Sequence, residues 1–157
     1  MNSLMENSQR AGTQTGALKV LVALDGSEAA TNAAGLIART LTGHTQLRLI
    51  TVLSYENYPM GPFQEPLSDA SSRMAEIRRR EREAVAGARK VLGDGHEISV
   101  IHRFGHPGFE ILAEIQEWSP DLVVTGRRGL GLAKGLLLGS VSQYLLRHCE
   151  TPLLIVP

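Results

Sequence analysis

The sequence predicts one soluble α/β domain in which a single open, five-stranded parallel sheet is flanked by helices on both faces. Short runs rich in branched apolar residues alternate along the chain with stretches in which apolar residues recur every three or four positions. The runs at 20–24 and 153–156 are apolar without interruption, as expected of strands buried on both faces of a parallel sheet. A length of 157 residues is usual for one domain.

Five segments have the composition and length of strands, and turn residues bound them. Helical stretches separate successive strands, and such crossover connections favour a mainly parallel, right-handed sheet. The five predicted strands are Leu18–Leu24, Leu47–Leu53, Glu97–Arg103, Asp121–Thr125 and Pro152–Val156.

The first two helices follow from apolar spacing and capping residues. Ser27 is placed to cap the first helix, which stops before Gly43. The second helix is predicted at about Ser71–Leu92. Its charged run at 78–83, Arg-Arg-Arg-Glu-Arg-Glu, indicates a solvated face.

The last two helices are predicted from their first residues. Pro107 is favoured in the first turn of a helix, and apolar residues at helical spacing follow it. The fourth helix is expected to begin near Gly139 or Ser140, after a glycine-rich stretch.

The connection Glu56–Asp69 is predicted to have no regular structure. It contains Pro59, Gly61, Pro62 and Pro66 within a few positions. Because it is long for a connection inside a domain, two interpretations stay open: a lid over a ligand site, or a mobile loop.

The first 17 residues are predicted to be a flexible tail that precedes the domain at 18–157. They are polar and mixed in charge. They lack the continuous apolar stretch that a signal peptide or a membrane span requires.

Charge and cysteine content narrow the function classes. Sixteen basic residues balance sixteen acidic ones, so no general field favours nucleic acid or an anionic membrane as a partner. Cys149 is the one cysteine of the chain and cannot form an internal disulfide, which is consistent with a reducing compartment and predicts a cytoplasmic protein.

The two strand ends that carry unusual residues are expected to form the ligand site. In open parallel sheets the ligand crevice lies beyond the carboxyl ends of the strands, where the strand order reverses. The first predicted strand ends in Asp25-Gly26-Ser27, and the fourth ends in Thr125-Gly126.

The segment from Gly126 to Gly139 has the composition of an anion-binding loop. It holds five glycines in fourteen positions. Glycines allow backbone N–H groups to wrap an anion and adopt the positive φ that such a nest needs. At the start of the following helix, the dipole and the free N–H groups of Gly139 and Ser140 favour a phosphate, to which the Ser140 hydroxyl adds a hydrogen bond.

The charge around this segment is positive, and other nucleotide motifs do not fit. No acidic residue occurs from Leu122 to Cys149, a stretch that contains four basic residues. The P-loop string GxxxxGK[ST] is absent, and too little chain follows for a dinucleotide fold. A receiver domain would need an aspartate where the third predicted strand ends in Arg103-Phe104-Gly105.

Residues 126–140 carry a spaced signature, G-x2-G-x9-G-[S/T], and in this the chain resembles the ATP-binding universal stress proteins of the UspA type. The resemblance extends to the opening strand and its exit at 20–27, to Gly-His-Pro at 105–107, and to the closing segment 149–156. It covers about residues 18–157 and implies a Rossmann-like fold of the adenine nucleotide alpha hydrolase type.

The resemblance implies a ligand and a set of contacts. The ligand would be ATP, or AMP or ADP, often with a divalent ion such as Mg²⁺ or Mn²⁺. Asp25 would lie close to the adenosine, and Val52 would offer backbone groups to the adenine edge. The ribose and phosphates would be held by Gly126, Gly129, Gly139 and Ser140.

Arg127 is part of this predicted nucleotide site and departs from the family, which more often has Ser, Thr or His there. Two effects stay open: its charge strengthens phosphate attraction, or its bulk narrows the loop.

Family members are commonly homodimers joined along the last strand, which here implies residues 152–156.

No catalytic residues are predicted, because the sequence shows no nucleophile elbow and no pair of carboxylates with an acid and base division. His102 and His106 straddle a strand end and make a poor metal pair. The preferred function is a nucleotide-binding stress-response or signalling module. The alternatives are a slow ATPase or nucleotidyl-transfer enzyme that uses Asp25, or a dimerisation module that binds no nucleotide.

Overall fold

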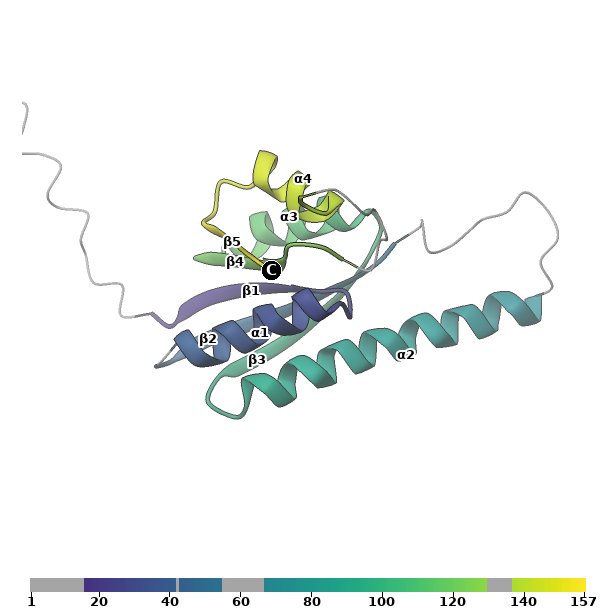
Figure 1. The fold of residues 1–157 in the computed structure, drawn as a ribbon, viewed down its shortest axis with the longest axis horizontal. Coiled ribbons are helices and arrows are strands. Elements are labelled where there is room, and N and C mark those ends of the chain that lie inside the picture. The colour runs from purple at the N-terminus through teal and green to yellow at the C-terminus, as the bar shows by residue number, and fades with distance from the viewer. Residues whose placement is uncertain (1–15, 42, 55–66, 130–136) are drawn as a thin grey trace, which may run out of the picture.

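The computed structural model describes residues 16–41, 43–54, 67–129 and 137–157. They form a five-stranded sheet with strand order β3-β2-β1-β4-β5, and all four strand pairs are parallel (Figure 1). The predicted fold class is therefore confirmed. The strands are β1 (Leu18–Leu24), β2 (Thr45–Leu53), β3 (Glu97–Phe104), β4 (Leu122–Gly126) and β5 (Leu153–Val156).

β1 has the predicted bounds, and the other four strands differ from the prediction by one or two residues at an end. β2 begins at Thr45, which pairs with Leu18 at the start of β1. β5 begins at Leu153 rather than Pro152, because a proline has no N–H to donate to the ladder. The carbonyl of Pro152 still accepts a hydrogen bond from the N–H of Val123, at 2.9 Å.

Four helices connect the strands, and three of them begin where the sequence predicts. Ser27 caps the first by accepting a hydrogen bond from the N–H of Ala30. Pro107 and Ser140 are the first residues of the third and fourth. The helices are α1 (Glu28–Thr40), α2 (Leu67–Leu92), α3 (Pro107–Trp118) and α4 (Ser140–His148).

α2 begins earlier than expected, at Leu67 instead of Ser71. The prediction that Glu56–Asp69 has no regular structure is thus wrong for its last three residues. A proline blocks a helix only from the interior, so Pro66 permits a helix that starts at the next residue. The remainder of that segment, for which both a lid and a mobile loop stay open, lies outside the described residues.

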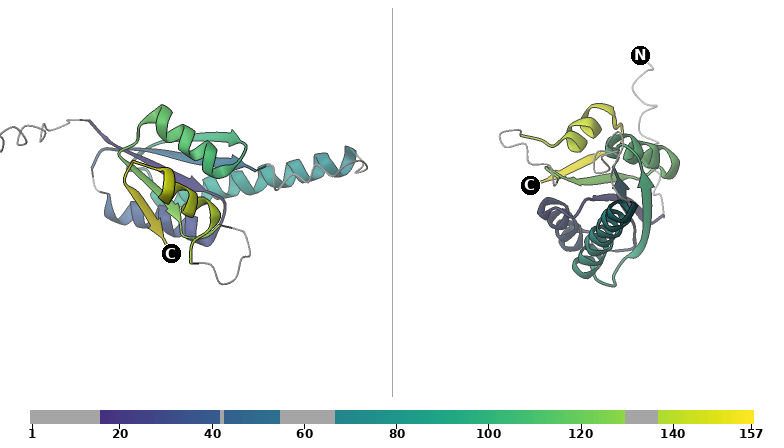
Figure 2. Two further views of the ribbon diagram at one scale, coloured as in Figure 1. Left: turned by 90° about the horizontal axis from the view of Figure 1, so that it is seen from above. Right: turned by 90° about the vertical axis from the view of Figure 1, so that its right-hand side faces the viewer.

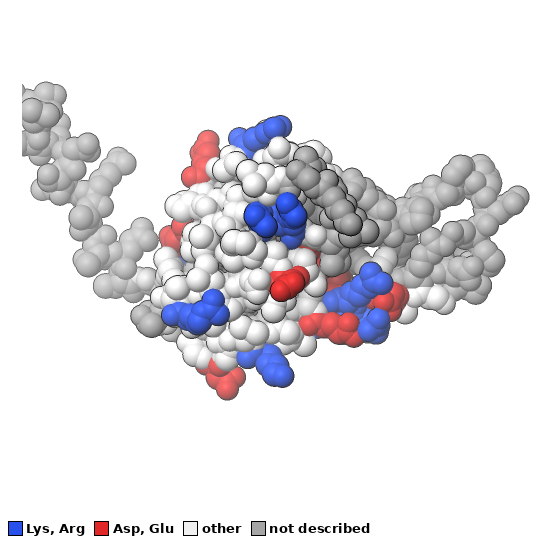
Figure 3. Space-filling view, viewed as in Figure 1, with Lys and Arg blue, Asp and Glu red and all other residues white. Residues whose placement is uncertain are grey.

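α2 is the longest helix, and its amino-terminal part extends past the sheet (Figure 2). The charged run 78–83 is exposed except for Glu81, as predicted for a solvated face. Figure 3 shows acidic and basic side chains together on this helix, where Arg79 bridges Glu76 and Glu83. None of the described helices is long and apolar enough to cross a membrane.

The sheet separates two apolar cores. α1 and α2 cover one face and α3 and α4 cover the other (Figure 1). Alternate residues of β1 point to opposite faces, so that Val20 and Val22 join the first core and Leu21 joins the second. The helices are thereby fixed, and the start of each lies at the carboxyl edge of the sheet.

Candidate functional site

The strand order places a crevice between β1 and β4. The chain moves outward from β1 to β2 and β3, then crosses over to β4 and β5 on the other side of β1. The order therefore reverses between β1 and β4, the position at which open parallel sheets bind ligands. The segments that leave β1 and β4 are the two that the sequence predicts.

The segment that leaves β1 turns tightly into α1. Gly26 has a φ of +83°, a conformation that other residues adopt rarely. The carboxylate of Asp25 accepts a hydrogen bond from the N–H of Ser27 at 2.9 Å. Asp25 is exposed at the crevice, whereas Ser27 is buried beneath it.

Gly126 ends β4 and brings the start of α1 close to this exit. A Cβ atom placed on Gly126 would lie 2.8 Å from the Cβ of Ala29 and 3.0 Å from the backbone nitrogen of Ala30. Only a residue without a side chain permits this approach, because the contacts include backbone atoms. The exits of β1 and β4 are thus held against one another.

The next two described glycines also lie in tight contacts. A Cβ on Gly129 would collide with the carboxylate of Asp25. A Cβ on Gly139 would lie 3.3 Å from the Cα of Arg128. Asp25, Gly129 and Gly139 come from three separate segments, and the structure brings them to one place.

The glycines serve close approach rather than unusual backbone angles. The expectation of positive φ is wrong for Gly126, Gly129 and Gly139, none of which is among the positive-φ residues. A side chain at any of the three would have to displace a neighbour, and at Gly126 that neighbour is helix backbone. Gly131 and Gly135 lie outside the described residues.

Not every amide at the start of α4 is available to a ligand. The N–H of Gly139 donates to the carbonyl of Arg127 at 2.8 Å, which corrects the expectation that this N–H is free. The first intrahelical bond runs from the N–H of Gln143 to the carbonyl of Gly139. The helix therefore leaves the N–H groups of Ser140, Val141 and Ser142 without an intrahelical acceptor.

The backbone of Arg127, the residue after β4, is hydrogen-bonded both to β5 and to the residue before α4. Its N–H donates to the carbonyl of Val156 at 2.6 Å, and its carbonyl accepts from Gly139. These bonds do not involve its side chain, so the family's smaller residues would fit the same backbone.

Val52 lies level with the end of β1. The pairing of β1 with β2 ends at Leu24 and Thr51, and Val52 is the next residue of β2. On its other side Val52 pairs with Arg103 of β3. Its backbone groups toward β1 thus face the segment that begins with Asp25, which is where the resemblance places an adenine.

Two serines belong to the site in a way that the sequence analysis missed. Ser27 was predicted only as a helix cap, and Ser142 was not singled out. The Ser27 hydroxyl donates to the carbonyl of Arg128 at 3.3 Å, and the Ser142 hydroxyl lies 3.0 Å from the carbonyl oxygen of Arg127. A serine in the first turn of a helix can bond backward, which is the signal that could have identified Ser142.

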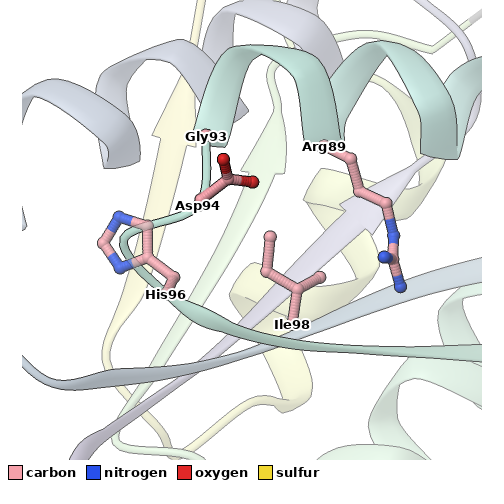
Figure 4. Close-up of a pocket in the computed structure, with 5 residues that line it drawn as sticks. All are labelled: Arg89, Gly93, Asp94, His96 and Ile98. Carbon is pink, nitrogen blue, oxygen red and sulfur yellow. The ribbon is translucent and has the colours of Figure 1, made fainter.

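A shallow pocket lies at the opposite end of the sheet, with a volume of about 220 Å³. It lies where the end of α2 turns into β3 (Figure 4). The carbonyl end of a helix disfavours anions, so this pocket is a poor phosphate site. Its lining residues are Arg89, Gly93, Asp94, His96 and Ile98.

The described residues contain no group of three or more His, Cys, Asp or Glu side chains that could hold a metal ion. His102 lies 2.7 Å from the hydroxyl of Thr51, and His106 stacks on Phe109. The thiol of Cys149 donates to the carbonyl of Thr151 and packs beside the core under α3 and α4.

The model of the Universal stress protein family matches residues 17–157. Among curated relatives, the Universal stress protein in QAH/OAS sulfhydrylase 3′region of Thermus aquaticus is 34% identical over 141 residues. This match covers 87% of the chain and 96% of the relative, so the two proteins correspond over nearly their whole lengths.

Solved structures share the fold. The hypothetical protein MJ0577 superposes with a TM-score of 0.76 at 22% identity, over 88% of this chain and 94% of its own. A universal stress protein in complex with cAMP superposes with a TM-score of 0.58 at 26% identity, over 89% of this chain and 96% of its own.

Proposed function

Because this chain belongs to the universal stress protein family, we propose that it binds an adenine nucleotide, foremost ATP, in the crevice between β1 and β4. One observation carries the proposal. A Cβ atom on Gly129 would meet the carboxylate of Asp25, and a Cβ atom on Gly139 would lie 3.3 Å from the Cα of Arg128, so a side chain at either position would have to displace its neighbour. Gly129 therefore presents bare backbone beside Asp25, whereas the N–H of Gly139 already donates to the carbonyl of Arg127. The N–H groups of Ser140, Val141 and Ser142, which have no intrahelical acceptor, lie at a helix start and suit a phosphate. The cAMP complex of a related structure supports an adenine nucleotide.

Each part of the nucleotide has a matching group. The backbone of Val52 would bind the adenine edge. The carboxylate of Asp25 would accept from ribose hydroxyls, because a carboxylate next to Gly129 would repel a bare phosphate. The phosphates would lie toward Ser140, whose hydroxyl and N–H begin α4. Gly126, Arg127, Gly129 and Gly139 would shape the cradle.

A divalent ion such as Mg²⁺ or Mn²⁺ fits this site only together with the nucleotide. Among the described residues Asp25 is the carboxylate in contact with the glycine loop. One carboxylate and several phosphate oxygens are a usual environment for Mg²⁺. The ion would neutralise phosphate charge, and Asp25 would orient it.

The proposed role is a ligand-controlled module in a stress response or signalling process, in the cytoplasm, where a lone cysteine stays reduced.

Dimerisation along β5 is part of the proposal. β5 is an edge strand of four apolar residues, whereas the other edge, β3, carries Glu97, His102 and Arg103. Charged residues protect an edge from pairing, so β5 is the better one for a second copy. Light scattering of the purified protein measures the oligomer directly.

The glycine loop gives the sharpest test of nucleotide binding. Gly129→Val places a Cβ against the carboxylate of Asp25, whereas the Cβ of Gly87→Val in α2 has open space within 4 Å beyond its own helix backbone. With ATP at a hundred times its dissociation constant, the wild type and Gly87→Val should gain about 2.7 kcal/mol of stability. Gly129→Val should gain none in the same thermal melts. An equal gain in both variants would place the nucleotide elsewhere.

The enzyme alternative has its own measurement. A binding module should show at most slow release of phosphate from ATP. Steady multiple turnover that Asp25→Ala abolishes would favour an ATPase or a nucleotidyl-transfer enzyme instead.

A further inference from the structure

Two buried hydroxyl groups hold the segment that leaves β4 from opposite faces of the sheet. Ser27 is 8% exposed and Ser142 is 2% exposed. Ser27 caps α1 on one face, and Ser142 lies in the first turn of α4 on the other. They reach the carbonyl oxygens of two consecutive residues, Arg128 and Arg127 respectively.

We propose that Ser27 and Ser142 are positioning residues for the nucleotide phosphates; this inference rests on the proposed function. The peptide that joins Arg128 to Gly129 is planar and trans, so its carbonyl and N–H point in opposite directions. When Ser27 holds the Arg128 carbonyl toward α1, the N–H of Gly129 is turned away from α1. The direction of one cradle amide is thus set by a hydroxyl that does not touch the ligand.

Ser142 acts on the other end of the cradle. Its hydroxyl lies 3.0 Å from the carbonyl oxygens of both Arg127 and Gly139, and its one proton is shared between them. The carbonyl of Arg127 also accepts the N–H of Gly139. These bonds clamp the first turn of α4 to the exit of β4, which sets the separation between their amides.

A cradle held in this way is already ordered, so that phosphate binding loses little conformational entropy. If a tether is removed, only a fraction of the molecules holds the binding geometry, and the apparent affinity falls by that fraction. The loss of affinity should concern the phosphates, because Asp25 and Val52 make the expected adenosine contacts. The substitutions keep the backbone N–H of Ser27, which is the group that binds Asp25.

The experiment compares ATP with adenosine, which lacks phosphates. Titration calorimetry would use Ser142→Ala, Ser27→Ala and Ser27→Thr, each below its melting temperature. Ser99→Ala is the matched control, since the Ser99 hydroxyl also donates to a backbone carbonyl, that of Leu47, but on β3. Ser142→Ala and Ser27→Ala should bind ATP roughly five- to tenfold more weakly, the scale of one hydrogen bond.

Adenosine affinity should change less than twofold in both alanine variants, and Ser27→Thr should restore ATP affinity because threonine both caps and donates. A purely structural role would lower the melting temperature without changing the ratio of ATP to adenosine affinity. ATP affinities equal to that of Ser99→Ala, or equal losses for ATP and adenosine, would overturn the inference. Wild-type protein that binds neither compound would overturn the proposed function itself.

Discussion

The two faces of the sheet are held by different forces. Under α1 and α2 an apolar cluster forms the core and the buried side chains carry no charge; α1 contributes Ala30, Ala33, Ala34 and Ile37. Under α3 and α4 a carboxylate is buried: Glu114 is 1% exposed and pairs with Arg48 at 2.6 Å and Arg103 at 2.5 Å.

Contacts between aromatic rings also hold the second face, under α3 and α4. Phe109 of α3 and Tyr144 of α4 lie edge to face with centroids 5.0 Å apart, and Tyr144 stacks on His148 at 4.4 Å. The guanidinium of Arg48 lies 4.3 Å from the ring centroid of Trp118. Each face nevertheless delivers the start of one helix, α1 or α4, to the same crevice. The site therefore depends on two packing arrangements that can be weakened separately.

The largest loss of stability is expected from a substitution in the apolar core under α1 and α2. Leu49→Ala removes a fully buried side chain and should lower the free energy of unfolding by about 2–5 kcal/mol. The loss should not vary with salt, because no charge is involved. Urea denaturation at low and high salt measures both quantities, and a marked salt dependence would contradict the assignment of an apolar core.

On the other face, Glu114→Ala leaves two guanidinium groups without their shared carboxylate. It should lower the free energy of unfolding by about 2–4 kcal/mol, less than for a fully buried pair because the arginine side chains are partly exposed. Glu150→Ala, at an exposed position, is the control. A loss no larger than that of the control would show that the ion pairs do not hold α3.

Two glycine substitutions compare how firmly each face holds its helix. A Cβ on Gly126 meets backbone atoms of Ala29 and Ala30 at 3.0 Å, whereas a Cβ on Gly108 meets the Tyr144 ring at 2.6 Å. A ring moves more readily than a helix backbone, so Gly126→Ala should cost about 1–3 kcal/mol and Gly108→Ala less. Thermal melts with and without ATP would test this order, and its reversal would mean that α1 adjusts more easily than α4.

The smallest expected effect is the loss of stability in acid at the ion pair of Glu117 with Arg103, under α3 and α4. The hydrogen bond from Arg103 lowers the pKa of Glu117 below its usual 4.5. The stabilisation is therefore present above pH 4.5 and is lost as the pH falls through the lowered pKa. Carbon-13 NMR titration of the Glu117 carboxylate measures that pKa. Arg103→Gln should return it to the usual value, and an unchanged pKa would exclude this pair as the cause.

Local signals account for the elements that the sequence predicts well. Ser27 caps α1 and Pro107 opens α3, and in each case the residues that decide the helix start are neighbours in the chain. The prediction does not reach the start of α2, because the prolines at 59–66 lead it to exclude regular structure as far as Asp69. The predicted last strand includes Pro152, whose missing N–H keeps it out of the β5 ladder.

The site was predicted less completely than the fold. The signature glycines were found from their spacing. Of the two reasons assigned to them, positive φ was wrong for Gly126, Gly129 and Gly139, and the approach of backbone N–H groups to an anion stays a prediction. The atoms that crowd them belong to Asp25, Ala29 and Arg128. Contacts between such distant positions depend on the packing of β1 beside β4.

The sequence by itself determined the alternation of strands and helices, the helix starts at Ser27 and Pro107, and the spaced glycines, because periodicity, caps and spacing are properties of neighbouring residues. Only the tertiary structure decided which amides remain available and which hydroxyls hold the loop. The bond from Ser27 to Arg128 spans 101 positions of the chain. It exists because the strand order places the first and fourth strands side by side, and no local pattern encodes that order.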